Sequence, residues 1–221
     1  MDRKLVVFDW NGTLLADTAA SWKAANVCLE FYGRPPISLA HYRETFHFPV
    51  IHFYALNGVS VDEVLARKDE GNALFQSTYE TLAARSRTRK GALTLLHWIQ
   101  ESKMDCIILS NYLTNKIEAH LARLNIDSSF SYVSAHDCDG TTILQNTTKA
   151  ERLSAFMVKR GYKPADAVII GDSMEEPDIA RHLGLTSIGI TDGYISRKRL
   201  QDSRPDYIVH NLTDVINVLK G

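Results

Sequence analysis

A short apolar run that ends in an aspartate, close to the start of the chain, most constrains the fold. The run Leu5–Phe8 contains two adjacent valines and is too short for a helix, so it predicts a strand buried on both faces. Strands of this kind belong to parallel sheets that are covered by helices. Asp9 follows the strand directly, at the end where ligands bind in open α/β sheets. The sequence therefore predicts an active-site carboxylate at a strand end.

The residues after Asp9 predict a tight turn with room for a phosphate group. Gly12 permits a positive φ and a close approach of the backbone, and Thr13 adds a hydroxyl and an amide. The alternative is an ordinary β-turn in which Asp9 only hydrogen-bonds its own loop. Further functional side chains at other strand ends would distinguish the two.

From Gly91 onward, the chain alternates between helical and strand-like segments joined by short connections. The expected helices are 91–102, 114–124, 149–160 and one that ends at Leu183, and the expected strands are 106–109, 132–133, 168–170, 187–190 and 207–209. Such alternation predicts a parallel sheet with right-handed crossovers and helices on both faces. The fold class is therefore α/β, with a Rossmann-like core of three αβα layers.

A helical block of about 70 residues separates the first strand from this alternating part. Its first helix follows residue 15, with Asp17 or Thr18 as the N-cap, and ends near Gly33. Further helices are expected over 38–47, 49–56 and 61–85. No strand pattern interrupts the block, which indicates an all-helical insert in the α/β core.

Polar side chains follow two more of the predicted strands. Ser110 and Asn111 come after strand 106–109, and Asp172 comes after strand 168–170 through the tight exit of Gly171. Because the carboxyl ends of parallel strands converge on one crevice, we expect these side chains to lie near Asp9. Ordinary turn chemistry is the alternative for Ser110 and Asn111.

A lysine is expected to bring positive charge to the same crevice. Lys149 opens the helix that precedes strand 168–170, so its ammonium is placed to reach an anion there. Lys163 is the rival, but it lies just before that strand and hence at its wrong end. We therefore predict Lys149 as the site lysine.

Together, these residues resemble the four motifs of the haloacid dehalogenase-like (HAD) hydrolases, in the phosphoglycolate phosphatase-like branch with a helical cap. Asp9-Trp10-Asn11-Gly12-Thr13 is similar to the first motif, D-x-D-G-T, and Ser110 and Lys149 resemble the second and third. Gly171-Asp172 resembles the fourth motif, G-D-x-x-x-D, in which Glu176 matches the last position better than Asp178 does, with Glu175 as a substitute.

The resemblance implies a role for each matching residue. It implies that Asp9 is the nucleophile that forms an aspartyl-phosphate, aided by Ser110 and Lys149 as the other catalytic residues. It also implies Mg²⁺ as the cofactor, a hard cation that prefers oxygen ligands. The implied metal ligands are Asp9, the backbone carbonyl of Asn11, and Asp172, with Glu176 behind them; the implied phosphate-binding residues are Gly12, Thr13, Ser110, Asn111 and Lys149.

The resemblance also divides the chain into two domains. Residues 1–15 and 89–221 would form the core domain, and residues 16–88 a helical cap that closes over the crevice and excludes water. Four residues near Pro49 are candidates for substrate contact, although such residues at helical spacing are also typical of a cap's own core: Arg43, Phe46, His47 and Phe48.

Asn11 departs from the family pattern, which has an aspartate there. By resemblance, that aspartate protonates the leaving group and later activates water, whereas an amide does neither. Loss of a general acid/base typically lowers a rate by about 10²- to 10⁴-fold. Three functions stay open: a phosphatase or phosphotransferase for leaving groups that need little protonation, an ordinary metabolite phosphatase that obtains its proton elsewhere, and a weakly catalytic phospho-ligand-binding protein.

Composition favours a small phosphorylated metabolite as the partner. The formal net charge is −1 and both signs are intermixed, which argues against nucleic acid or a membrane surface as partners. The basic stretch 85–90 is expected to be a solvated connector. Three widely spaced cysteines, Cys28, Cys106 and Cys138, predict a reducing compartment and hence the cytoplasm. The oligomeric state stays open.

Overall fold

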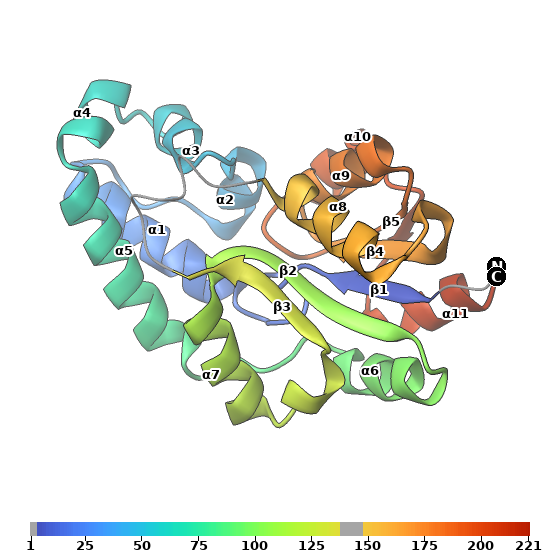
Figure 1. Cartoon of the computed structure of the whole chain (residues 1–221). Coiled ribbons are helices and arrows are strands. Elements are labelled where there is room, and N and C mark those ends of the chain that lie inside the picture. The colour runs from blue at the N-terminus through green and yellow to red at the C-terminus, as the bar shows by residue number, and fades with distance from the viewer. Residues whose placement is uncertain (1–3, 138–147) are drawn as a thin grey trace.

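The computed structural model describes residues 4–137 and 148–221, and Cys138 lies outside the described residues. Its centre is a six-stranded sheet in which every pairing is parallel, with the order β3-β2-β1-β4-β5-β6 (Figure 1). The strands are β1 Leu5–Phe8, β2 Asp105–Leu113, β3 Tyr132–His136, β4 Ala167–Gly171, β5 Thr186–Ile190 and β6 Tyr207–Val209. The predicted parallel α/β sheet is confirmed.

The first strand lies at the middle of the sheet and is buried on both faces, as its apolar run predicts. Val7 pairs with Ile107 of β2 on one side and with Ile169 of β4 on the other. Alternate residues of β1 enter different apolar clusters, because successive side chains of a strand point to opposite faces. Val6 belongs to one cluster and Leu5 to the other.

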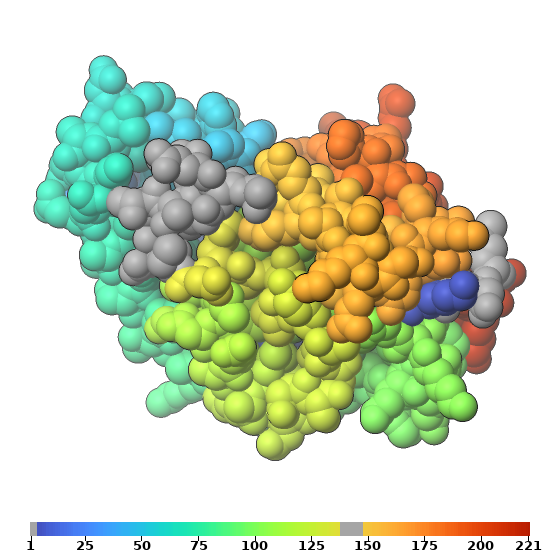
Figure 2. Space-filling view, viewed as in Figure 1, coloured from blue at the N-terminus to red at the C-terminus, as the bar shows by residue number. Residues whose placement is uncertain are grey.

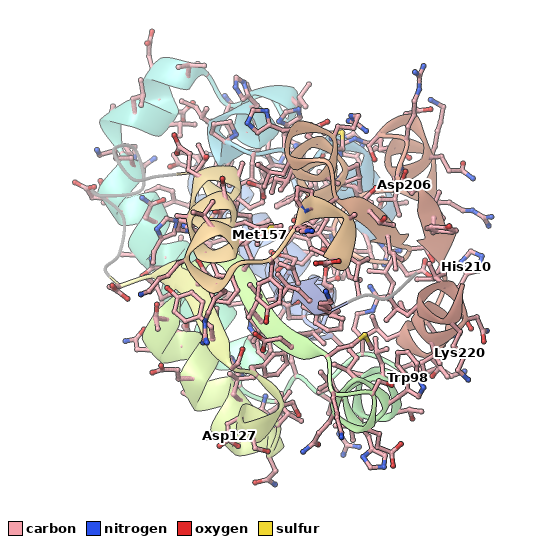
Figure 3. The ribbon with its side chains drawn as sticks, turned by 45° about the vertical axis from the view of Figure 1, so that its right-hand side comes forward. Trp98, Asp127, Met157, Asp206, His210 and Lys220 are labelled. Carbon is pink, nitrogen blue, oxygen red and sulfur yellow. The ribbon has the colours of Figure 1, made fainter. Side chains whose placement is uncertain are left out.

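Helices cover both faces of the sheet and complete the three layers. One cluster joins the sheet to α6, α7 and α11, and the other joins it to α8 and α9. The helices of this part are α6 Ala92–Glu101, α7 Thr114–Leu124, α8 Lys149–Arg160, α9 Glu175–Leu183, α10 Arg197–Asp202 and α11 Val215–Lys220. Figure 3 labels Met157 on α8, and Trp98 on α6 and Lys220 on α11, two helices that belong to the other cluster. The Lys220 ammonium lies 6.0 Å from the centroid of the Trp98 ring.

The helical insert lies between β1 and α6, as predicted. Its helices are α1 Thr18–Phe31, α2 Leu39–Thr45, α3 Val50–Leu56, α4 Val61–Ala66 and α5 Lys68–Ala83. In Figure 2, α4 and α5 stand at one side of the molecule, away from α8 and α9. The insert has an aromatic core, and Tyr194, Ile195 and Leu200 from the α/β part join that core. The two parts are therefore packed together by apolar contacts.

Three predicted element bounds were wrong, among them the strand expected over 132–133, which extends to His136. The single helix expected over 61–85 is two helices, because the backbone leaves helical geometry at Arg67, whose guanidinium lies 3.7 Å from the Phe31 ring centroid. The strand expected to end at Leu109 continues to Leu113, with a shift in its register against β3. Ser110 and Asn111 therefore lie within the irregular end of β2 and not after it.

The chain crosses between insert and core at two adjacent points. Leu15 and Thr88 form an antiparallel bridge, and the amide of Ala16 donates to the carbonyl of Arg87 at 2.8 Å. The predicted domain limits, 15/16 and 88/89, fall at this crossing and stay a prediction. None of the helices within the described residues has the length and apolar character that a membrane crossing needs.

Candidate active site

A buried lysine joins three carboxylates at the carboxyl end of the sheet. The Lys149 ammonium lies 2.8 Å from Asp9 Oδ1, 2.9 Å from Glu176 Oε1 and 3.0 Å from Glu175 Oε2. Lys149 begins α8, and a capping box between Thr148 and the helix fixes that start. The fold thus brings together the predicted Lys149, Asp9 and Glu176. Glu175, which sequence reasoning ranked second, also contacts Lys149.

Asp172 lies beside Asp9, and the Thr13 hydroxyl joins the two carboxylates. Thr13 Oγ1 donates to Asp172 Oδ1 at 2.9 Å and lies 3.3 Å from Asp9 Oδ2. The backbone N–H of Tyr194 donates to Asp172 Oδ2 at 2.6 Å. Gly12 has a φ of +73°, and a Cβ there would lie 2.3 Å from Asp172 Oδ2. The turn therefore requires glycine both for its conformation and for its approach to Asp172.

We call Asp9, Lys149, Asp172, Glu175 and Glu176 the Lys149 centre. It holds four carboxylates against one ammonium. Burial, together with the charge of Glu176, raises the pKa of Asp172 to about 7, despite the hydrogen bond from Tyr194. Burial also raises the pKa of Asp9, and Lys149 opposes that rise. Burial would lower the pKa of Lys149, but the carboxylates raise it well above its usual value, so the ammonium stays charged.

The excess of negative charge makes this centre fit a divalent cation. Asp9 and Asp172 offer carboxylate oxygens side by side, and Asp172 contacts no cationic side chain within ion-pair distance in the described part of the chain. Within the described ranges, no group of three or more His, Cys, Asp or Glu side chains has a metal-binding arrangement. Two carboxylates with water and substrate oxygens are a common way to hold Mg²⁺.

Asn111 contacts Glu175 of the Lys149 centre, and Ser110 contacts Arg152 of the same helix as Lys149. Ser110 is buried, its Oγ accepts from the Tyr112 amide at 3.1 Å, and Asn111 Nδ2 lies 3.2 Å from Glu175 Oε2. Arg152 donates to the Ser110 carbonyl at 2.6 Å. Sequence reasoning missed Arg152, although it lies three residues after Lys149 and hence on the same helix face.

A second buried carboxylate, Asp17, lies on the other side of the Gly12 turn. Its Oδ1 accepts from the Gly12 amide at 2.7 Å. Its Oδ2 accepts from Asn11 Nδ2 at 2.8 Å, from the Tyr79 hydroxyl at 2.5 Å and from the Tyr194 hydroxyl at 2.9 Å. We call Asn11, Asp17, Tyr79 and Tyr194 the Asp17 centre. The sequence predicted Asp17 only as a helix cap, but its side chain makes no capping hydrogen bond.

Two arginines, one in the insert and one in the connector that follows it, donate hydrogen bonds to backbone carbonyls of the core. Arg89 donates to the carbonyls of Gly12 and Thr191, each at 2.6 Å, so the prediction that stretch 85–90 is a solvated connector was wrong at this residue. Arg43 of α2 donates to the Gly193 carbonyl at 3.0 Å and to the Asp192 carbonyl at 2.8 Å.

The other candidates for substrate contact differ in exposure. Phe46 is buried, and its ring centroid lies 4.9 Å from that of Tyr194, so Phe46 belongs to the packed boundary between insert and core. Phe48 is half exposed, and His47 Nδ1 lies 2.8 Å from the Phe48 carbonyl oxygen. Contact of these residues with substrate stays a prediction.

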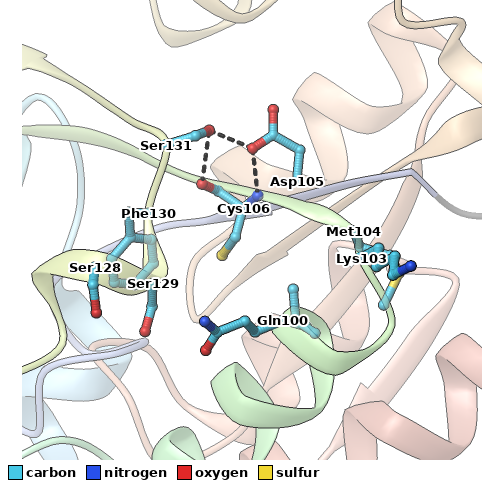
Figure 4. Close-up of a pocket in the computed structure, with 10 residues that line it drawn as sticks. Gln100, Lys103, Met104, Asp105, Cys106, Ser128, Ser129, Phe130 and Ser131 are labelled. Carbon is cyan, nitrogen blue, oxygen red and sulfur yellow. Dashed lines mark hydrogen bonds between the residues drawn. The ribbon is translucent and has the colours of Figure 1, made fainter.

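A cavity of about 410 Å³ lies elsewhere, at the amino-terminal end of β2 (Figure 4). Asp105 and Cys106 line it, together with Ser128–Ser131. The side chains of the Lys149 centre meet at the opposite, carboxyl-terminal end of the strands. The cavity therefore does not belong to the candidate active site.

Comparisons with known proteins agree with this geometry. The sequence profile of the haloacid dehalogenase-like hydrolases matches residues 6–175, and a second profile, named HAD-hydrolase-like, matches residues 141–215. A phosphoglycolate phosphatase from Synechococcus elongatus is 25% identical over 217 residues, which cover 97% of this chain and 96% of the relative. Phosphoglycolate phosphatase 1 from Pseudomonas aeruginosa is 24% identical, over 96% of this chain and 78% of the relative.

The fold also matches solved structures over its full length. A haloacid dehalogenase-like family protein from Streptococcus pneumoniae superposes with a TM-score of 0.81 at 20% identity, covering 99% of each chain. At this level of identity, the match establishes the architecture alone.

Proposed function

The chain belongs to the haloacid dehalogenase-like hydrolases, and from this premise we propose that it is a Mg²⁺-dependent phosphatase acting on a small phosphorylated metabolite. The observation that carries the proposal is the contact of Asp9 with Lys149 beside Asp172. A carboxylate, a buried ammonium and a cation-binding carboxylate are the groups that phosphoryl transfer to an aspartate needs. The names of the two relatives make phosphoglycolate a substrate to include in any test.

In the proposed reaction, an oxygen of Asp9 attacks phosphorus, and the bond from phosphorus to the departing oxygen breaks. Water then hydrolyses the aspartyl-phosphate, which releases phosphate and restores the carboxylate. Lys149 orients Asp9 through Oδ1 and neutralises charge on the phosphoryl oxygens. Ser110 and the amides of the Gly12 turn would position that group. A Mg²⁺ ion held by Asp9, Asp172 and the Asn11 carbonyl would add further positive charge, with Glu176 behind it.

Asn11 favours one variant of this function. Because its amide cannot give a proton to the leaving group, acyl or aryl phosphates would react faster than alkyl phosphates, and phosphotransfer is the closest alternative. A weakly catalytic phospho-ligand-binding protein would not need the Asp9 nucleophile. Cys28 and Cys106 are buried free thiols, which supports the proposed reducing, cytoplasmic location.

The test is hydrolysis of p-nitrophenyl phosphate, acetyl phosphate and phosphoglycolate with and without Mg²⁺. Wild type should turn over at least one of them only with Mg²⁺, and Asp9→Asn should lower that rate by several orders of magnitude. The exposed Asp62→Asn, which makes the same chemical change on α4, is the matched control and should match wild type. Turnover that is equal in wild type and Asp9→Asn would contradict the proposal.

A further inference from the structure

The Asp17 centre fixes the orientation of the Asn11 side chain. Asn11 Nδ2 lies 2.8 Å from Asp17 Oδ2 and 2.7 Å from the Tyr79 hydroxyl oxygen. An amide nitrogen has two hydrogens, so these two partners use both of them. The amide oxygen is then the hydrogen-bonding atom of Asn11 that is available to accept from another molecule.

Asp17 holds this arrangement because every group that contacts its carboxylate is a donor. The Gly12 amide occupies Oδ1, while Tyr79 and Tyr194 donate to Oδ2 beside Asn11. Burial and the Asp17 charge raise the pKa of both phenols, so they remain protonated donors. A reversed Asn11 amide would direct its oxygen at a carboxylate, which is unfavourable in a buried site.

We propose that Asp17 is a positioning residue that, with Tyr79 and Tyr194, holds the Asn11 amide with its oxygen toward the departing group of the substrate. The inference rests on the proposed phosphatase function and deepens it. The Asn11 amide oxygen cannot give a proton to a departing alkoxide. It can accept a hydrogen bond from a leaving group that has a hydroxyl of its own. The pair Asn11 and Asp17 thereby selects the leaving group.

The pairing has a consequence for substitutions. N11D alone would place a second carboxylate against Asp17, at the separation now spanned by a 2.8 Å hydrogen bond. Two like charges at this distance in a buried site are strongly unfavourable. The exchange N11D/D17N keeps one charge and one amide in the pair, and the new amide can donate to the new carboxylate.

The experiment compares wild type, N11D, D17N and N11D/D17N, with D62N as the exposed control. Each protein is measured for its melting temperature and for turnover of p-nitrophenyl phosphate and ethyl phosphate with Mg²⁺. N11D should melt lower than wild type, and the exchange should recover at least half of that loss. Turnover of ethyl phosphate should be about 10²-fold higher in the exchange than in wild type, because a carboxyl at residue 11 can supply a proton that the amide cannot. N11D should stay below the exchange, because it lacks the residue 17 amide that orients this carboxyl.

The ratio of ethyl to p-nitrophenyl phosphate turnover separates positioning from a purely structural role. In NMR spectra, we expect the hydrogens of the Asn11 side-chain amide to exchange slowly in wild type and faster in D17N. N11D that melts like wild type and hydrolyses ethyl phosphate as fast as the exchange would overturn the inference, as would an unchanged Asn11 amide signal in D17N. If wild type has no Asp9-dependent turnover, the phosphatase proposal fails separately, and the melting temperatures and the amide signal still decide on the pairing.

Discussion

The Lys149 centre and the Asp17 centre both bury carboxylates next to the Gly12 turn, but they stabilise them differently. At the Lys149 centre, three carboxylates share one ammonium at 2.8 to 3.0 Å. At the Asp17 centre, one carboxylate accepts four hydrogen bonds from two phenols, one side-chain amide and one backbone amide. None of the ion pairs of the described residues involves Asp17.

The difference shows which centre attracts the reacting charges and which one positions side chains beside them. Excess negative charge at the Lys149 centre attracts a dication or a phosphoryl group, because charges interact strongly at a buried site. At the Asp17 centre, neutral N–H and O–H groups donate directional hydrogen bonds to one carboxylate, so no further negative charge is left to attract a cation. The Lys149 centre should therefore respond to cations, and the Asp17 centre to changes in shape and hydrogen bonding.

The largest expected effect comes from removing the ammonium. Lys149→Met leaves the buried Asp9 and Glu176, and the partly exposed Glu175, without their cation, which should lower the free energy of unfolding by about 3 to 5 kcal/mol. Urea unfolding at pH 7 measures this loss. Lys198→Met removes an exposed lysine paired with Asp202 and should change stability by less than about 0.5 kcal/mol. Equal losses in the two variants would mean that the Lys149 centre is not held by charge.

Mg²⁺ should distinguish the two centres next. At a concentration 100 times its dissociation constant, it should raise the free energy of unfolding by about 2.7 kcal/mol, because it binds only the folded protein. Asp172→Asn should lose most of that gain, whereas Tyr79→Phe at the Asp17 centre should keep it. Thermal unfolding with and without Mg²⁺ provides the measurement. A gain that Asp172→Asn retains would place the ion elsewhere.

The hydrogen bonds of the Asp17 centre should contribute less. Tyr79→Phe removes the hydroxyl that donates to Asp17 at 2.5 Å, and hydrogen bonds to charged groups are worth about 1.5 to 3 kcal/mol. We expect a loss of about 2 kcal/mol in urea unfolding. Tyr207→Phe, at a half-exposed tyrosine of β6, is the matched control and should change stability by less than about 0.5 kcal/mol. If both variants unfold alike, the phenol does not stabilise Asp17.

The two centres also differ in how far the sequence predicts them. Asp9 and Asp172 follow apolar strands, and their meeting is predicted because parallel strands converge at their carboxyl ends. The Asp17 centre has no such local signal: Tyr79 is 62 residues from Asp17 and Tyr194 is 177. Only the docking of the insert on the core brings them together.

The bounds of helices and strands are likewise predicted where neighbouring residues determine them, and missed where contacts between distant parts of the chain determine them. The apolar blocks predict every strand of the sheet. The inner strands β1, β2, β4 and β5 leave the longest blocks, because most of their residues are buried, while the partly exposed edge strands β3 and β6 leave shorter ones. The break at Arg67 was missed, since Arg67 packs on Phe31 of another helix. Arg89 was missed because its partners, the carbonyls of Gly12 and Thr191, lie far away along the chain.

The smallest expected effect concerns His120, a buried base that faces a cation instead of an anion. Burial and the nearby Arg123 lower the pKa of His120, against the weaker opposing charges of Glu80 and Asp17, and Lys116 adds a still smaller lowering. Arg123 lies 2.9 Å from His120 Nδ1, and the ring lies 6.3 Å from that of Trp10. The native state therefore favours the neutral imidazole.

The sign of the pH dependence follows from this lowered pKa. The unfolded chain takes up a proton on His120 near pH 6.5, while the folded protein does not, so stability should fall as the pH decreases below about 6.5. In His120→Gln, the free energy of unfolding should decrease less between pH 7 and pH 5 than it does in wild type. The difference should be smaller than the stability that Tyr79→Phe loses. His97→Gln, which makes the same change at an exposed histidine, is the matched control. If His120→Gln has the same pH dependence of stability as wild type, the fold tolerates a protonated His120 that has no carboxylate partner. Buried charge would then need no partner here, which would contradict the difference between the two centres.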